Sequence, residues 1–292
     1  RMPPTIVGVV PALSAILKAL TRPGDKVIVQ PPVYNCFFSS IRNNGCVMLQ
    51  SRLIQNGLSW SMDFDDLEAK AADPDAKVMI LCNPHNPAGR VWTEEELRKV
   101  GDICLRHNVF VISDEIHCEL TYPEHDYTPF ASLGEEFRLH SATCISPSKA
   151  FNIAGLQIAN IVTANNEIRA LIDKAININE VCDVNPFGVE ATIAAYTPDG
   201  AQWLDELRDY LHENWLIVRD FFAASIPTCP VTELEGTYLV WIDIRSTGLS
   251  SDEVSSRLLD EQKLMVNSGS MYGGEGFIRL NIACPRSQVV EA

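Results

Sequence analysis

A lone lysine between two serines and an apolar turn is the strongest chemical signal in this sequence. The stretch is I-S-P-S-K-A-F-N-I-A-G, residues 145–155, with Lys149 near its middle and Ser146 and Ser148 just before it. The apolar run 142–145 indicates the end of a buried strand. Lysine is rarely buried unless it is paired or used, and desolvation makes its amine a nucleophile that can form a Schiff base. An ordinary lysine on a loop also fits this stretch taken alone.

Polar side chains follow two other predicted strands at the point where each strand ends. The run 78–82 is followed at once by N-P-H-N-P-A-G-R, which contains Asn86. The β-branched run 109–113 is followed by Asp114. Ligands of open parallel sheets bind beyond the carboxyl ends of the strands. We therefore expect an amide, a carboxylate, hydroxyls and the Lys149 amine to surround one crevice.

Two further segments could contribute to such a crevice. Gly8-Val9-Val10-Pro11 leads into an apolar-periodic helix, whose first N–H groups could bind phosphate. A plain helix start is the simpler interpretation of that segment. Pro31-Pro32-Val33-Tyr34 places an aromatic ring at the end of a predicted strand.

The elements that must position these residues alternate between strands and helices. This alternation predicts a three-layer α/β/α domain with a mostly parallel sheet. Thr93 and Glu96 have the spacing of a capping box, which places a helix start at residue 93 and an end near His107. Further strands are predicted at 26–30, 46–50 and 158–163, and further helices begin at 63 and cover 165–178.

The pattern changes from about residue 197, which predicts a second, smaller α+β unit. One long amphipathic helix is predicted over 199–222, followed by two strand-like runs that meet at Glu235-Gly236. A helix follows from Ser250, and F-I-R-L-N-I-A at 277–283 predicts a last strand. We expect residues 1–198 to form a large cofactor-binding domain. Residues 199–292 would form the connecting helix and the small domain.

Composition excludes several classes of partner. The 292 residues include 38 acidic and 23 basic side chains, a formal net charge of −15, which argues against nucleic acid or an anionic membrane as a partner. The nine cysteines are scattered, which favours a reduced, cytoplasmic protein. Cys82 with His85 and Cys104 with His107 have ligand-like spacing, but each pair stands alone, so no metal is predicted.

A buried lysine, a carboxylate and nearby hydroxyls together suit pyridoxal phosphate. The amine binds the cofactor covalently, the acid keeps the pyridine nitrogen protonated, and the phosphate takes hydroxyls and helix N–H groups. The chain resembles fold-type I pyridoxal-phosphate enzymes of the class I/II aminotransferase superfamily, and more closely the MalY/PatB-type cystathionine β-lyase branch. The matching motifs, in family order from about residue 8 to 286, are P-G-D-K-V, P-P-V-Y, L-C-N-P-H-N-P-A-G-R-V-W, S-D-E-I-H, S-P-S-K-A-F-N-I-A-G-L-Q and G-F-I-R-L-N-I-A-C-P-R.

The resemblance implies roles around the cofactor ring. Lys149 would carry the cofactor and then act as the general base at the substrate Cα. Asp114 would pair with the pyridine nitrogen, and Asn86 would donate to the phenolic oxygen and contact the substrate. Tyr34 would stack on the ring face as part of the catalytic site. His117 stands where many related transaminases have a tyrosine, and it would touch the phenolic oxygen or only pack the site wall.

The resemblance also implies which residues bind the cofactor phosphate and the substrate carboxylate. Ser146, Ser148 and the backbone of Val9 and Val10 would hold the phosphate. Arg279, on a strand that otherwise favours apolar residues, would bind the substrate α-carboxylate bidentately. Without the resemblance, a surface arginine on an edge strand would be the simpler interpretation.

Two features depart from the family pattern. Gln157 stands where many relatives have a phosphate-binding arginine, so the phosphate would depend on hydroxyls and backbone amides. Few residues precede the G-V-V-P-A-L motif, and the final helix after Arg286 is short, so the chain resembles a fragment of the family chain. A homodimer is implied by the family alone.

The predicted reaction is β-elimination of L-cystathionine or a related cysteine S-conjugate to a thiol, pyruvate and ammonia. An aminotransferase would use the same residues and is the nearest alternative. A truncated, non-catalytic paralogue is another. Ser146 and Lys149 also match the S-x-x-K of serine acyl enzymes, but the K-T-G element of that class is missing. No residue identifies the pocket for the leaving group, and the loop 268–276 is only a candidate.

Overall fold

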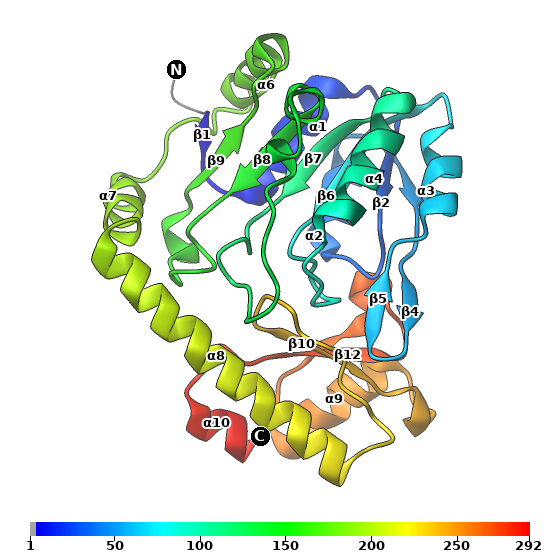
Figure 1. Cartoon of the computed structure of the whole chain (residues 1–292), viewed down its shortest axis with the longest axis vertical. Coiled ribbons are helices and arrows are strands. Elements are labelled where there is room, and N and C mark those ends of the chain that lie inside the picture. Colours follow the sequence, from blue (N-terminus) through cyan, green and yellow to red (C-terminus); the bar gives the residue numbers. More distant parts are fainter. Residues whose placement is uncertain (1–3) are drawn as a thin grey trace.

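The core of the chain is a seven-stranded sheet in a computed structural model that describes residues 4–292. The strand order is β1-β9-β8-β7-β6-β2-β3 (Figure 1). Five neighbouring strands are parallel to one another: β3, β2, β6, β7 and β8. Strand β9 runs antiparallel to β8, and β1 runs antiparallel to β9. The bounds are β1 (Thr5–Ile6), β2 (Lys26–Val29), β3 (Val47–Gln50), β6 (Ala76–Cys82), β7 (Phe110–Asp114), β8 (Ser141–Ile145) and β9 (Ala159–Val162).

Helices cover both faces of this sheet, as the alternation of strand side chains requires. Along β6, Val78 and Ile80 belong to one apolar core, while Met79 and Leu81 belong to the other. The first core includes side chains of α1 (Val9–Leu20), α2 (Asn35–Asn43) and α6 (Asn166–Ile178). The second includes side chains of α3 (Phe64–Ala71), α4 (Glu94–Arg106) and α5 (Glu135–Leu139). The predicted three-layer α/β/α architecture is confirmed.

The expected capping box is present at the start of α4. The Thr93 hydroxyl accepts from the Glu96 backbone N–H, and the Glu96 carboxylate accepts from the Thr93 N–H. These bonds satisfy two of the four N–H groups that a helix start leaves without an intrahelical partner. The helix ends at Arg106, one residue before the predicted end.

A second, three-stranded sheet lies beside the first, in the order β10-β12-β11. The long helix α8 (Pro198–Ser225) runs from the large sheet past this smaller one (Figure 1). A third apolar core joins α8 to β10 (Leu239–Asp243) and β12 (Phe277–Asn281). The remaining elements here are α9 (Ser251–Gln262), β11 (Asn267–Ser268) and α10 (Arg286–Glu291). The division into two domains at residue 198 stays a prediction.

One of the two predicted strand runs around Glu235-Gly236 is wrong. Only the second forms a strand, β10, while the first makes a single bridge between Val231 and Ile242. The backbone N–H groups of Glu235 and Gly236 donate to the carbonyl of Gly89 instead. This part of the run is therefore hydrogen-bonded to the loop that carries Asn86 and is not part of a sheet.

A hairpin and a helix are the main additions to the predicted elements. The hairpin, β4 (Ile54–Asn56) and β5 (Ser59–Ser61), turns at Gly57-Leu58, where Gly57 has a positive φ of 62°. Helix α7 (Pro186–Ala195) precedes α8. Within residues 4–292, no helix combines the length and the apolarity that crossing a bilayer requires.

Candidate active site

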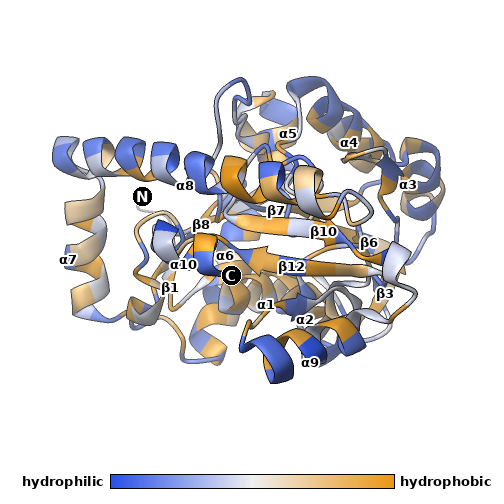
Figure 2. Cartoon of the chain, turned by 90° about the horizontal axis from the view of Figure 1, so that it is seen from below, coloured by the Kyte–Doolittle hydropathy of each residue, from blue (hydrophilic) through white to orange (hydrophobic). Residues whose placement is uncertain are grey.

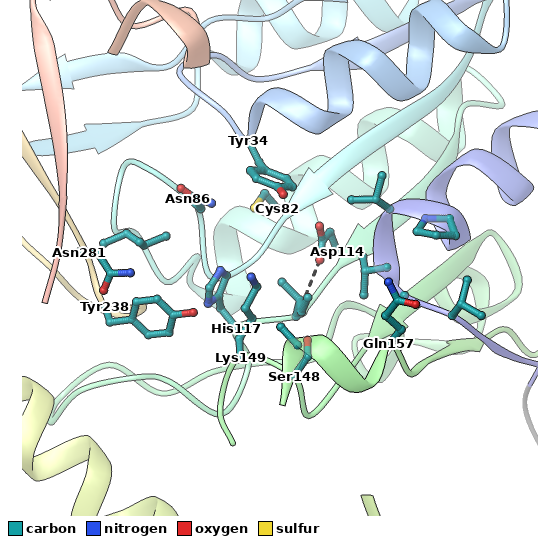
Figure 3. A pocket seen from close by; sticks show the side chains of 18 of the residues that line it. Tyr34, Cys82, Asn86, Asp114, His117, Ser148, Lys149, Gln157, Tyr238 and Asn281 are labelled. Atoms are coloured by element: carbon teal, nitrogen blue, oxygen red, sulfur yellow. Dashed lines mark hydrogen bonds between the residues drawn. The ribbon is translucent and has the colours of Figure 1, made fainter. Parts of the chain in front are cut away.

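A cavity of about 440 Å³ lies where β6, β7 and β8 end and α1 begins (Figure 3). This is the sheet edge at which the sequence predicted a crevice. The structure brings nine of the ten predicted site residues to its wall, namely Val9, Val10, Tyr34, Asn86, Asp114, His117, Ser148, Lys149 and Arg279. Ser146 is the tenth, and it does not line the cavity.

The turn after β8 explains the different places of the two serines. The Ser146 hydroxyl donates to the carbonyl of Ile158 at 2.6 Å and accepts from the backbone N–H of Ser148 at 3.1 Å. Ser146 is thus used to shape the turn, and Ser148 and Lys149 reach the cavity. Lys149 is only half-buried because it stands at the cavity wall rather than inside the core.

Asp114 is a buried carboxylate at the floor of the cavity. Its side chain is 3% exposed and accepts one hydrogen bond, from the backbone N–H of Ile116 at 3.1 Å. No cation of the described residues lies within ion-pair distance. Burial is the largest of the causes that together raise the pKa of Asp114 to about 7; the charge of Glu115 also raises it, whereas the Ile116 N–H and the charge of Lys149 lower it. A protonated pyridine nitrogen of a bound cofactor would offset the cost of burying the negative charge of Asp114.

Arg279 and Asn86 meet across the two sheets. Arg279 Nη1 donates to Asn86 Oδ1 at 2.9 Å, and Nη2 donates to Asn267 Oδ1 at 3.0 Å. The guanidinium lies over the ring of Tyr272, 4.5 Å from its centroid. Its Nε is buried without a partner, and no carboxylate of the described residues pairs with it. A cation placed in this way suits a carboxylate ligand.

His117 is uncharged near neutral pH. Burial, together with the charges of Lys149 and Arg279, lowers its pKa to about 3. Its ring stands edge-on to Tyr238, with centroids 5.8 Å apart, and its Nδ1 has no hydrogen-bond partner among the described residues. Tyr34 lines the cavity at the start of α2, and burial raises the pKa of its hydroxyl.

The opposite end of the cavity is formed by the start of α1. Gly8 precedes this helix with a φ of +151°, a conformation that favours glycine, and no side chain caps the helix. The first N–H groups of a helix lack intrahelical partners and attract anions. Ser148 and Gln157 lie nearby in Figure 3, and among the described lining the only cations are Lys149 and Arg279. A phosphate at this end would therefore be held mainly by N–H groups and hydroxyls.

Among the lining residues that the sequence reasoning missed are three that carry a thiol, a hydroxyl or an amide: Cys82, Tyr238 and Asn281. Asn281 lies two residues after Arg279 on β12, and this spacing places both on the same face of a strand. That periodicity could have found Asn281, whereas Tyr238 had no comparable signal. The candidate loop 268–276 does not line this cavity, since Ser268 and Ser270 bind Asp252 instead.

The two Cys/His pairs are occupied by other contacts. The Cys82 thiol donates to the carbonyl of Pro84, and His85 Nε2 is 2.9 Å from the carbonyl of Pro32. Cys104 contacts a methionine sulfur, and His107 binds Glu68. Within residues 4–292, no group of three or more His, Cys, Asp or Glu side chains is placed to hold a metal ion.

Arg90 fixes the loop that carries Asn86. Its Nε donates to Glu235 at 2.9 Å and its Nη2 to Glu96 at 3.0 Å. Both carboxylates are mostly buried, at 13% and 19% side-chain exposure. Glu235 also accepts from the backbone N–H of Val91. The network holds the Asn86 loop against the segment that leads into β10.

Replacing Arg90 by methionine is expected to lower the free energy of unfolding by about 3 kcal/mol, because two partly buried carboxylates lose their partner. Urea denaturation measures this loss. Arg98→Met is the matched control, since Arg98 pairs with Glu94 on the exposed face of α4 and should cost less than about 0.5 kcal/mol. Equal losses in the two variants would contradict a structural role for the Arg90 network.

The cavity fits pyridoxal phosphate by its own chemistry. The buried Asp114 carboxylate without a cation suits the ring nitrogen, and the open start of α1 with Ser148 suits the phosphate. The unpartnered Nδ1 of His117 and the amide of Asn86 line the same cavity, as does Lys149. The donor set therefore matches the cofactor in charge and in hydrogen-bonding groups.

Known proteins resemble this chain in sequence and in structure. The family described as aminotransferase class I and II matches residues 5–292. Cystathionine β-lyase PatB of Bacillus subtilis is 43% identical over 279 residues, covering 95% of this chain and 72% of PatB. The crystal structure of cystalysin from Treponema denticola, which contains pyridoxal 5'-phosphate, superposes with a TM-score of 0.96 at 35% identity, covering 98% and 73%. The PLP-bound C–S lyase of Staphylococcus hominis gives 0.90 at 32% identity, covering 99% and 76%.

Proposed function

We infer that this chain, which belongs to the class I and II aminotransferase family, is a pyridoxal-phosphate-dependent carbon–sulfur β-lyase. Its fold is that of the fold-type I enzymes, and it uses pyridoxal phosphate. The substrate is an amino acid, for which we propose L-cystathionine or a related cysteine S-conjugate. The similarity to PatB and the C–S lyase supports the lyase reaction. One observation supports the cofactor and an amino-acid substrate most: a single cavity joins Lys149 to a carboxylate without an ion-pair partner and to an arginine without a carboxylate.

The roles proposed for the residues follow from their places in the cavity. Asp114 would hold a proton on the ring nitrogen, and Tyr34 would cover the ring. Asn86 and His117 would hydrogen-bond the phenolic oxygen. The phosphate would lie at the N–H groups of Val9 and Val10 and the hydroxyl of Ser148, with Ser146 as the residue that positions the turn.

The reaction would need three actions of this chain. Arg279 binds the α-carboxylate of the substrate and thereby fixes Cα near Lys149. The Lys149 amine takes the Cα proton, and the Cβ–S bonding electrons leave with the sulfur, which takes up a proton as the thiol. The cofactor, when bound, accepts the electron pair left at Cα. The three-carbon enamine that remains adds water and yields pyruvate and ammonia.

The nearest alternative, an aminotransferase, would differ in its products and in its need for a keto acid. Purified protein with pyridoxal phosphate and L-cystathionine should release pyruvate and a thiol in equal amounts without any added keto acid. Amino transfer that depends on an added keto acid, without release of thiol, would favour the aminotransferase. No product in either assay would favour a non-catalytic paralogue.

We propose that the chain forms a homodimer through α7. Phe187 and Ile193 of this helix are 74% and 60% exposed, and Tyr196, which directly follows it, is 56% exposed. Figure 2 shows α7 at the edge of the molecule. Homodimer interfaces are richer in apolar side chains than the remaining surface. A second copy would cover these side chains.

Ile193→Asp is therefore expected to convert dimers to monomers in sedimentation experiments, because a charge would be buried in the interface. Leu259→Asp is the control, since Leu259 is a similarly exposed aliphatic residue on α9 (47%). A parent protein that is monomeric, or equal dissociation of both variants, would contradict this assignment.

We also propose a cytoplasmic location. All nine cysteines are free in the structure, including buried ones such as Cys46, Cys104 and Cys144. Free cysteines in this number are typical of a reducing compartment.

A further inference from the structure

A second cavity adjoins the candidate active site on the other side of Lys149. We call it the α8 groove; it has a volume of about 460 Å³ and is lined by Lys149, Ala150, Asn152, Trp203, Leu207, Tyr210, Leu211, Tyr238, Asn281, Ala283, Cys284 and Pro285. Lys149, Tyr238 and Asn281 line both cavities, so these three side chains frame the passage between them. Figure 3 shows the three on one side of the active-site cavity.

The other walls of the active-site cavity are closed or already assigned to the cofactor, so a substrate side chain can extend in few directions. The start of α1 with Ser148 is the phosphate end, and Asp114 with Cys82 forms the floor. Beyond Arg279, Tyr272 is 2% exposed and fills the space under the guanidinium. A substrate whose carboxylate is on Arg279 and whose Cα is at Lys149 therefore meets the α8 groove at Asn281 and Tyr238.

The groove is mostly apolar. Lys149, which belongs to the active site, is the only charged residue of the described lining, and the polar groups are the amides of Asn152 and Asn281 and the hydroxyls of Tyr210 and Tyr238. Its far wall consists of Trp203, Leu207, Tyr210 and Leu211, from successive turns of α8. The ring of Trp203 is held by Phe151, which stacks on it at 5.7 Å between centroids and 22° between planes. Walls of this kind bind aromatic and aliphatic groups and carry no charge that could pair with a charged substituent.

We propose that the α8 groove receives the sulfur substituent of the substrate and selects cysteine S-conjugates with an apolar, in particular aromatic, substituent. This inference rests on the lyase function proposed above and names its substrate class. The homocysteine portion of cystathionine carries an ammonium, for which the described lining of the groove has no carboxylate, and a carboxylate, for which its only cation is Lys149 of the active site. A benzyl group would contact Trp203 and Leu207, while a methyl group would end at the passage.

Binding without turnover tests the groove apart from catalysis. In a Lys149→Ala background loaded with pyridoxal phosphate, the amine that takes the Cα proton is absent, and the change in cofactor absorption reports substrate binding. S-benzyl-L-cysteine is expected to bind at least about tenfold more tightly than S-methyl-L-cysteine, the range that apolar pockets achieve for added hydrocarbon. Adding Trp203→Ala should lower this ratio at least about fivefold.

Matched variants keep the test specific. Phe221→Ala removes another exposed aromatic side chain of α8, 53% exposed and outside the groove, and should leave the ratio unchanged. Leu207→Asp places a charge in the groove wall and should lower the ratio as Trp203→Ala does. Because this second variant changes a different residue of the wall, the test does not depend on the folding of Trp203→Ala alone. A parent ratio near one, no binding of either ligand, or an unchanged ratio in both groove variants would overturn the proposal.

Failure of the lyase function would look different. Holoprotein with Lys149 intact that binds both ligands but releases no pyruvate from S-methyl-L-cysteine would refute the lyase, and the binding ratio would still report on the groove. Release of pyruvate with unchanged ratios in the groove variants would refute only the groove.

Discussion

Lys149→Ala is expected to lower the rate of pyruvate release by on the order of a thousandfold, because a positioned general base alone contributes about 10² to 10⁴. The loss should appear in kcat, since the amine acts on the proton at Cα and not on the carboxylate held by Arg279. Circular dichroism should be unchanged, because Lys149 is half-buried at a cavity wall and not part of a core.

The matched control for this loss is Lys174→Ala, which removes an exposed lysine of α6. It should retain the activity of the parent. A Lys149→Ala variant with activity within tenfold of the parent would mean that another group takes the Cα proton. The proposed role of Lys149 would then be wrong.

Asp114→Asn is expected to lower kcat by on the order of a hundredfold, because a neutral amide no longer balances a proton on the ring nitrogen; losing one partner of a buried ion pair costs about 3 kcal/mol or more. The amide oxygen can still accept from Ile116, so the local hydrogen bond is kept. Initial rates at saturating substrate and cofactor measure the effect. Wild-type kcat in this variant would contradict the role.

The same substitution should stabilise the cofactor-free protein. Because burial raises the pKa of Asp114 to about 7, its charged form is disfavoured in the folded state, and stability falls as the pH rises from about 4 towards 7. The advantage of Asp114→Asn in free energy of unfolding should therefore grow by roughly 2–3 kcal/mol between about pH 5 and pH 8. Urea denaturation at the two pH values measures it. An equal pH dependence of the free energy of unfolding in the two proteins would show that burial does not raise the pKa of Asp114.

The parts of the site that come from strand ends could be predicted from the sequence. Asp114 is the last residue of β7, and Asn86 and Lys149 lie a few residues beyond β6 and β8; the carboxyl ends of parallel strands meet at one edge. Periodicity and turn residues were enough to find those ends. The start of α1, whose first residues line the cavity, was assigned to the site through the resemblance.

The parts that come from the second sheet could not be predicted in this way. Arg279 was assigned only through the resemblance, and Tyr238 was missed, because their approach to Asn86 and His117 depends on how two sheets pack. No local pattern encodes a contact between residues 193 positions apart. Ser146 shows a second limit, since composition shows that a hydroxyl is present but not that the turn already uses it.

The central claim, that this cavity binds pyridoxal phosphate through Lys149, can be measured directly. The protein would be incubated with the cofactor, reduced with borohydride to fix any lysine-bound cofactor, digested and examined by mass spectrometry. The account predicts one modified peptide, which carries the pyridoxyl group on Lys149. Modification of a different lysine, or none at all, would contradict the assignment of this cavity as the cofactor site.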